Sequence, residues 1–282
     1  MAVVTQPDRP AHRGRQIQES AVKRAARAAG LSIIQPERLR DPEWPARLGA
    51  LGADVAVVVA FGQILPAAVL AIARRGSINV HASLLPTYRG AAPIQWALVR
   101  GETETGITTF QMDPGMDTGP ILLTARTPIG PDETAGEVAL RLAPLGAEVL
   151  LETLRRLDTL TPVQQRHEEA TLAPRLQKAD GVIDWRRPAH ELVNLARGCN
   201  PWPGASTRAP SGTLTILRAR ALAGTPAPAS GTLVTRDATL AIATGDGCFL
   251  PLEVQPENRR AMGWDEYLRG ARLAAGALFT SP

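Results

Sequence analysis

The chain has 282 residues, which is enough for one large domain or two ordinary domains with a sizeable hydrophobic core. Hydrophobic residues make up 44% of the chain and charged residues 21%, and this balance excludes a disordered chain. The formal net charge is +4, and nearly all of the positive charge is arginine, because Lys23 and Lys178 are the only lysines. A polyanionic partner and a compositional preference for arginine explain this charge equally well.

The sequence contains no run that approaches the roughly 20 apolar residues of a membrane span, and its first residues lack the apolar core of a signal peptide. We therefore expect a cytoplasmic protein. Cys199 and Cys248 are the only cysteines, and they form neither a CxxC pair nor a disulfide scaffold. Two reduced thiols are expected.

The first half of the sequence alternates between strand and helix patterns. A short strand at residues 2–5 leads through a polar loop into a helix that Ser20 caps and Gly30 ends. Residues 54–60, DVAVVVA, form a β-branched run typical of a strand buried on both faces of a parallel sheet. Further strands are predicted at residues 77–81, 107–112 and 120–125, and helices at 66–76 and 93–100. This order predicts an α/β domain with a parallel, Rossmann-like sheet, because helices supply the crossovers that parallel strands need.

A long helix closes this first domain. Thr134 and Glu137 have the spacing of a capping box, and the helix runs to about Arg156 with Pro144 inside it, where a kink is expected. The polar segment after it has no sustained periodicity and is interpreted as a connection between domains.

The last third of the sequence has a different pattern. A short helix at residues 188–197 precedes strands near 213–220, 231–234, 239–243 and 249–254, with Asp246-Gly247 as a hairpin turn. Short strands separated by turn residues predict a small β-barrel. The predicted domains are therefore residues 1–160, a linker at 161–179 and residues 180–282.

Three polar residues are candidates for a catalytic site. Asn79 and His81 are two residues apart at the carboxyl end of a predicted strand, so their side chains share one face at the edge where open α/β sheets bind ligands. Asp117 lies in a later loop that can reach the same place. An amide donor, an imidazole and a carboxylate suit acyl transfer to an amine. Each residue alone is also an ordinary strand-end or turn residue, and the spacing does not decide between these readings.

Long sequence strings carry a resemblance that does decide. NVHASLLPTYRGAAPIQWAL, followed by ETGITTFQMDPGMDTG, resembles the signature of the folate-dependent formyltransferases. The opening TQPDRPAHRGR and the later VVVAFGQILP, EATLAPRL, GVIDW and NPWPGA are similar to the branch of that family that formylates methionyl-tRNA. The resemblance covers nearly the whole chain and implies a Rossmann-like formyltransferase domain followed by an OB-like barrel that binds tRNA.

The resemblance also implies roles for particular residues. Asn79, His81 and Asp117 are the expected catalytic group. The loop expected to line the folate site consists of Ser83, Leu84, Leu85 and Pro86. The expected substrates are 10-formyltetrahydrofolate and the amine of initiator methionyl-tRNA, without a metal, and a monomer is expected. Contacts with the acceptor stem are expected from Arg9, Arg13 and Arg15, and a further tRNA contact from Arg197.

The sequence departs from the family at its beginning. Family members carry a strand, a small-residue turn and a helix before the strand that leads into TQPDRP, and this β-α unit of roughly 30 residues is absent before Met1. We therefore expect that the native protein is longer. Reading the upstream DNA in frame tests this expectation, and a stop codon directly before Met1 would count against it.

Two alternatives remain open on the sequence. One is a formyltransferase that acts on glycinamide ribonucleotide or an amino sugar instead of tRNA, against which the arginine loop and the barrel argue. The other is a tRNA-binding remnant without activity, motivated by the absent β-α unit. A GxSxG elbow and the glycine-rich nucleotide motifs do not occur, which disfavours serine hydrolysis and a nucleotide cofactor.

Overall fold

The computed structural model describes residues 1–11, 16–224, 229–236 and 238–281. It forms two compact units. The first, called the sheet unit, consists of Met1–His81, Ile107–Ala125 and Gly146–Ala170. The second, called the barrel unit, consists of Ala82–Gly106, Arg126–Leu145 and Thr171–Pro282. Within the described residues, no helix is both long enough and apolar enough to span a membrane.

The sheet unit begins with a parallel crossover. β1 (Ala2–Val4) pairs in parallel with β4 (Ser32–Ile34), and α1 (Ala21–Ala28) lies between them in the chain. The Ser20 side chain accepts a hydrogen bond from Lys23 N at 3.0 Å, so the predicted N-cap is confirmed. α2 (Glu43–Gly49), which the sequence analysis did not predict, follows β4 and buries Trp44.

The predicted polar loop after β1 is in part a hairpin, so this prediction was wrong. β2 (Arg9–Ala11) pairs antiparallel with β3 (Gln16–Gln18), and residues 12–15 lie outside the described residues. Backbone hydrogen bonds between the two strands form this hairpin. Since no alternation of apolar side chains accompanies them, the sequence carries no strand pattern there.

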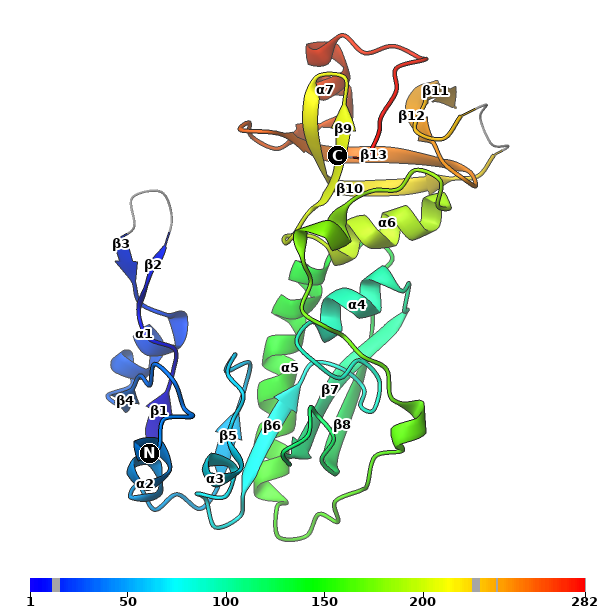
Figure 1. Ribbon diagram of the computed structural model, residues 1–282. Coiled ribbons are helices and arrows are strands. Elements are labelled where there is room, and N and C mark those ends of the chain that lie inside the picture. Colours follow the sequence, from blue (N-terminus) through cyan, green and yellow to red (C-terminus); the bar gives the residue numbers. More distant parts are fainter. Residues whose placement is uncertain (12–15, 225–228, 237, 282) are drawn as a thin grey trace. The chain divides into compact units, whose positions relative to one another are not determined.

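Four strands form the main sheet of this unit in the order β5-β6-β7-β8 (Figure 1). β5 (Ala56–Val58) is parallel to β6 (Ser77–His81), as predicted, whereas β7 (Glu104–Gln111) runs antiparallel to β6. β8 (Ile121–Pro128) is the last strand, and α3 (Ala67–Leu70), shorter than predicted, connects β5 and β6.

β5 is not buried on both faces, so that prediction was wrong. Val57 is 41% exposed, and the other two residues of β5 are half-buried. Within the described residues, β6 is the strand that pairs with β5, and no strand pairs with its other edge. A β-branched run indicates that a segment can be buried in a sheet. Whether it is buried depends on the strands and helices that pack against it.

α5 (Ala135–Arg155) covers one face of this sheet, so the candidate site lies on the other face. A side chain at Gly146 would come within 3.3 Å of Val80 Cγ1 and 3.5 Å of Ile107 Cδ1, so helix and sheet are in close contact there. The hydroxyls of Thr109 and Thr153 form a hydrogen bond of 2.7 Å on the same face. Because side chains alternate along β6, Asn79 and His81 project from the opposite face.

The barrel unit contains a six-stranded antiparallel sheet in the order β11-β12-β13-β10-β9, with β14 paired to β13 (Figure 1). The strands are β9 (Ala205–Ala209), β10 (Gly212–Leu222), β11 (Leu233–Arg236), β12 (Thr239–Ala243), β13 (Cys248–Pro256) and β14 (Met262–Gly263). Its helices are α4 (Pro93–Val99), α6 (Ala189–Gly198), α7 (Trp264–Ala271) and the 3-10 turn η2 (Lys178–Gly181). The turn η1 (His167–Glu169) belongs to the sheet unit.

The C-terminal segment links the two edges of this sheet. Arg208 in β9 exchanges two backbone hydrogen bonds with Thr280, at 2.8 and 2.9 Å. Leu233 N in β11 donates to Ala277 O at 2.8 Å, and Phe279 N donates to Gly231 O at 2.8 Å. The segment thus pairs with both edge strands of the path, β9 and β11, and this arrangement accounts for the predicted barrel.

The predicted capping box at the start of α5 is confirmed. Thr134 N donates to Glu137 Oε2 at 2.8 Å, and Glu137 N donates to Thr134 Oγ1 at 3.3 Å. The backbone N–H of Thr134, and then the guanidinium of Arg218, hold the pKa of the Glu137 carboxyl below its usual range. The box therefore begins the helix that covers the sheet.

Replacing Thr134 tests the contribution of this cap. We expect Thr134→Ala to lower the free energy of unfolding by about 1 kcal/mol relative to Thr134→Ser, because serine retains the hydroxyl and alanine does not. Urea unfolding followed by circular dichroism measures the difference. Equal midpoints for the two variants would show that the hydroxyl does not stabilise the helix.

Candidate functional site

His81 ends β6 on the sheet face opposite α5, and it is almost fully enclosed. Its side chain is 7% exposed. The imidazole lies edge-on to the ring of Phe110 in β7, with ring centres 6.4 Å apart. Asn79, two residues earlier on the same face, is half-buried. Asn79 and His81 therefore lie on one strand, and Asn79 is the more exposed of the two.

Asp117 lies beside His81. His81 Nδ1 and Asp117 Oδ2 are 3.7 Å apart, and the Asp117 side chain is 14% exposed. This separation is an ion-pair distance rather than a hydrogen bond. In such a shielded place a carboxylate acts on a neighbouring imidazole more strongly than it would in water. The structure thus brings these two predicted residues together, with the Nδ1 side of the ring turned toward the carboxylate.

The loop that carries Asp117 is held by internal polar contacts. Asp113 Oδ1 accepts hydrogen bonds from Gly115 N at 3.0 Å and from Thr118 Oγ1 at 2.6 Å. This is the geometry of an Asx turn. Asp117 itself has φ 55°, a left-handed conformation that aspartate adopts more readily than bulky residues do. The loop therefore presents the carboxylate from a turn that its own side chains stabilise.

Gly119 ends this turn where two backbone segments meet. A Cβ atom at Gly119 would lie 1.8 Å from Gln111 O. Gln111 is held in place there, because its backbone N–H donates to Pro120 O at 2.9 Å. Only a residue without a side chain fits here. The glycine of the DTG string is thus required by the loop that positions Asp117.

One residue of this loop's support was missed by the sequence analysis. Gln165 is 5% exposed and donates from Nε2 to Asp117 O at 2.9 Å and to Gly119 O at 2.7 Å. It lies in the segment that was interpreted as an interdomain connection. A polar residue in an aperiodic segment carries no pattern in the sequence that separates it from its exposed neighbours.

The predicted folate loop, Ser83 to Pro86, belongs to the barrel unit and follows His81 in the chain. Ser83 Oγ donates to Thr87 O at 2.6 Å, so the serine side chain shapes the loop. Ser83 and Leu85 are buried, whereas Leu84 and Pro86 are partly exposed. The partly exposed side chains are the ones that can contact a bound molecule directly.

Arg89, which follows this loop, is hydrogen-bonded to residues 171 and 173 of the barrel unit. Arg89 N donates to Thr171 O at 2.8 Å, and Ala173 N donates to Arg89 O at 2.7 Å. The Tyr88 hydroxyl donates to Glu102 Oε1 at 2.6 Å, and burial raises the pKa of this tyrosine well above its usual value. The EATLAPRL string thus pairs in parallel with the TYRG string through a single isolated β-bridge, between Leu172 and Arg89.

The four arginines predicted to contact tRNA lie in different parts of the chain. Arg9 is exposed in β2, and Arg13 and Arg15 lie outside the described residues. Arg197 is held within the barrel unit, where its guanidinium donates to Glu133 O at 2.9 Å and to Gly130 O at 2.8 Å. Burial lowers the pKa of Arg197. These bonds give Arg197 a structural role, and its contact with tRNA stays a prediction.

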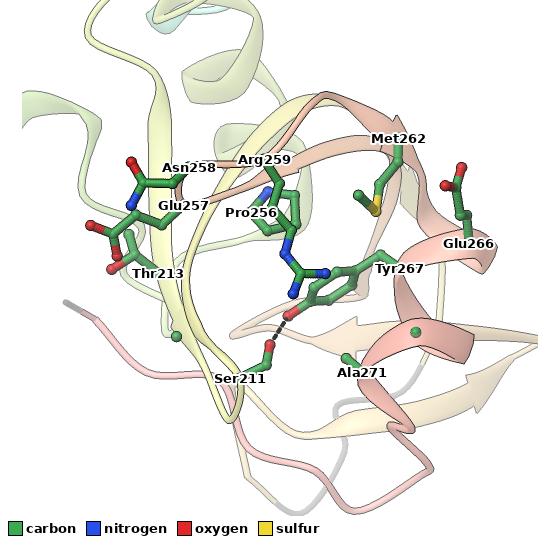
Figure 2. Close-up of a pocket in the computed structure, with 12 residues that line it drawn as sticks. Ser211, Thr213, Pro256, Glu257, Asn258, Arg259, Met262, Glu266, Tyr267 and Ala271 are labelled. Atoms are coloured by element: carbon green, nitrogen blue, oxygen red, sulfur yellow. Dashed lines mark hydrogen bonds between the residues drawn. The ribbon is translucent and has the colours of Figure 1, made fainter.

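The barrel unit also has a surface cavity of about 330 Å³ between β10, the end of β13 and α7. Figure 2 shows Tyr267 at this cavity, with its hydroxyl hydrogen-bonded to Ser211 Oγ at 2.7 Å. None of the predicted site residues lines it. In the described part of the chain, no group of three or more His, Cys, Asp or Glu side chains could hold a metal ion.

Comparison with known families identifies the class of protein. The formyl transferase model matches residues 1–154, and the model of the formyl transferase C-terminal domain matches residues 175–272. The chain therefore belongs to the formyl transferase family.

Named relatives are similar over nearly the whole chain. Methionyl-tRNA formyltransferase of Symbiobacterium thermophilum is 50% identical over an alignment that covers 100% of this chain and 88% of the relative. That of Solibacter usitatus is 48% identical, covering 96% of this chain and 88% of the relative. The fold is shared with an N-formyltransferase from Helicobacter canadensis, solved with folinic acid and dTDP-3-aminofucose, at a TM-score of 0.62 and 17% identity. That match covers 88% of this chain and 86% of the other.

Gly119 offers a test of how tightly the Asp117 loop is packed. We expect Gly119→Ala to lower the free energy of unfolding by roughly 1 to 3 kcal/mol, because the new methyl group overlaps a backbone oxygen that can move only with its strand. Gly49→Ala in α2 is the matched control, since no atom lies within 4 Å of the added methyl group. Thermal unfolding measures both, and an equal effect of the two substitutions would contradict the close approach.

Proposed function

We propose that this chain transfers the formyl group of 10-formyltetrahydrofolate to the free amino group of initiator methionyl-tRNA, in translation initiation. The observation that carries the proposal is the 50% identity, over the full chain, to a protein named methionyl-tRNA formyltransferase. Membership of the formyl transferase family and the pairing of His81 with Asp117 agree with it. Translation takes place in the cytoplasm, so the proposed function places the protein there, and we expect it to act as a monomer.

In the proposed reaction the amine of methionine attacks the formyl carbon and displaces the folate nitrogen. One N–C bond forms and another breaks, a proton leaves the attacking amine, and the departing folate nitrogen gains one. Negative charge develops on the formyl oxygen during the attack. The chain therefore has to stabilise that oxygen and move one proton between two nitrogens.

His81 is the proposed proton carrier. An imidazole can accept and return a proton near neutral pH, and a positioned acid/base group contributes on the order of 100- to 10,000-fold to a rate. Asp117 faces Nδ1, so its carboxylate orients the ring and stabilises the protonated form. In this arrangement Nε2, on the other side of the ring, exchanges the proton with the reacting nitrogens.

Asn79 is the proposed donor to the formyl oxygen. Its side-chain amide projects from the same face of β6 as His81. Removing one preorganised donor of this kind from other enzymes costs roughly 3 to 4 kcal/mol in the transition state. An amide donor and an imidazole together meet both requirements of the reaction.

The loop from Ser83 to Pro86 is the proposed folate-binding segment. Leu84 and Pro86 offer partly exposed apolar surface, which suits the flat ring system of a folate. Ser83 and Leu85 are buried and would act through the backbone of the loop. Guanidinium groups suit phosphate oxygens, so the proposed contacts with tRNA are three arginines near the start of the chain: Arg9, Arg13 and Arg15.

The alternative is a formyltransferase that acts on a small amine; a structure of similar fold was solved with an amino-sugar nucleotide. Its identity of 17% is informative about fold alone. The higher identity to methionyl-tRNA formyltransferases favours the tRNA substrate.

A substrate comparison tests the proposed function. We expect the purified chain to formylate charged initiator tRNA and not glycinamide ribonucleotide or an amino-sugar nucleotide. His81→Ala should reduce transfer at least 100-fold while tRNA affinity stays within about two-fold, because the imidazole moves a proton and does not hold the tRNA. His190→Ala, an exposed histidine of α6, is the control and should retain full transfer.

Formylation of a small amine but not of tRNA would overturn the proposed substrate. Binding of tRNA without transfer to any amine would indicate a tRNA-binding remnant. Unchanged transfer by His81→Ala would overturn the role of His81.

Arg13 tests the proposed contact with the acceptor stem. We expect Arg13→Ala to lower kcat/KM for charged tRNA roughly 10-fold, equivalent to about 1.4 kcal/mol, while folate binding is retained. The dependence of tRNA binding on salt should also weaken, because one phosphate contact is lost. Filter binding at several salt concentrations and folate titration measure the two effects. Loss of folate binding in this variant would contradict the assignment.

A further inference from the structure

The Asp117 loop is held from outside as well as by its own side chains. The Gln165 amide nitrogen donates to the backbone oxygens of Asp117 and Gly119, at 2.9 and 2.7 Å. A carboxamide nitrogen has two hydrogens, and both are used here on the two carbonyls that flank Thr118. Both partners lie in the sheet unit, and Gln165 is 5% exposed, so water does not readily replace these bonds.

A second contact fixes the segment that carries Gln165. Val163 and Ile121 exchange two backbone hydrogen bonds of 2.8 Å each, as two paired strands would. Ile121 is the first residue of β8 and follows the Asp117 loop directly. The segment from Val163 to Gln165 therefore holds the loop by a side chain at one point and by its backbone at another.

The position of Asp117 depends on this support. The turn formed by Asp113 holds the first part of the loop, through Gly115 and Thr118. Asp117 adopts φ 55°, a left-handed conformation that surrounding contacts help to maintain. Without the Gln165 amide, two enclosed carbonyl oxygens lose a hydrogen-bond donor. A rearrangement that exposes these oxygens to water then becomes more favourable.

We propose that Gln165 is a positioning residue, which sets the distance between Asp117 and His81 by fixing the carbonyls on both sides of Thr118. It acts through Asp117 and does not touch the substrates. The proposal rests on the proposed function, because it assigns Gln165 to the reaction in which Asp117 and His81 take part. A neutral amide is the side chain that supplies two donors here without adding a charge beside the Asp117 carboxylate.

Adjacent glutamines supply a matched pair of variants. Gln165→Met keeps a long side chain in the enclosed site but removes both donors, and Gln164→Met makes the same change at an exposed neighbour. We expect Gln165→Met to lower kcat for formyl transfer roughly 10- to 100-fold, because a displacement of about 1 Å can cost 100-fold. KM for folate and for tRNA should stay within about two-fold, and Gln164→Met should match the parent.

A double-mutant cycle separates positioning from general support of the fold. In an Asp117→Asn background, Gln165→Met should cause less than about a three-fold further loss, because the residue through which it acts is already disabled. If the loss in kcat is the same in both backgrounds, Gln165 does not act through Asp117. Full activity of Gln165→Met in the parent background would also overturn the proposal.

A structural measurement answers the question whatever the activity proves to be. In a crystal structure of Gln165→Met we expect a displaced Asp117 loop and a His81 Nδ1 to Asp117 Oδ2 distance longer than the 3.7 Å of the parent. An unchanged distance would overturn the positioning role even if the parent chain fails to transfer formyl groups, so the two proposals fail separately. If Gln165→Met does not fold, Gln165→Leu, which is shorter and lacks the donors without adding a charge, takes its place.

Discussion

The juxtaposition of the His81 imidazole and the Asp117 carboxylate at the end of β6 is the constraint on which the other features of the sheet unit converge. The two groups are 3.7 Å apart and largely shielded from water. Neither would hold this place alone, since one ends a strand and the other lies in a turn with φ 55°. The ladder between β6 and β7, the Asx turn of Asp113 and the Gln165 amide together supply the necessary support.

The packing of α5 determines which face of the sheet His81 and Asp117 occupy. α5 contacts the face of the sheet that carries Val80 and Thr109, and helix and sheet approach closely at Gly146. The alternation of side chains then places Asn79 and His81 on the other face. The sheet thus separates the side chains that pack against α5 from Asn79 and His81, which can contact a substrate.

The sequence predicted those features that local patterns encode. The Ser20 cap, the capping box of Thr134 and Glu137, and the strand at Ser77–His81 are determined by residues close together in the chain, and the structure contains them. The exposure of Val57 and the contacts of Arg197 could not be predicted, because each depends on segments distant in sequence. Gln165 shows the same limit at the site, since only folding distinguishes it from Gln164.

The most direct test of the central claim replaces the carboxylate alone. Asparagine tolerates the left-handed backbone of residue 117 and has nearly the shape of aspartate, so Asp117→Asn removes the charge and leaves the loop in place. Single-turnover formyl transfer to charged initiator tRNA should slow at least 100-fold in this variant, with an unchanged melting temperature and unchanged tRNA affinity. A rate equal to that of the parent would contradict the account, because the imidazole would then work without the carboxylate beside it.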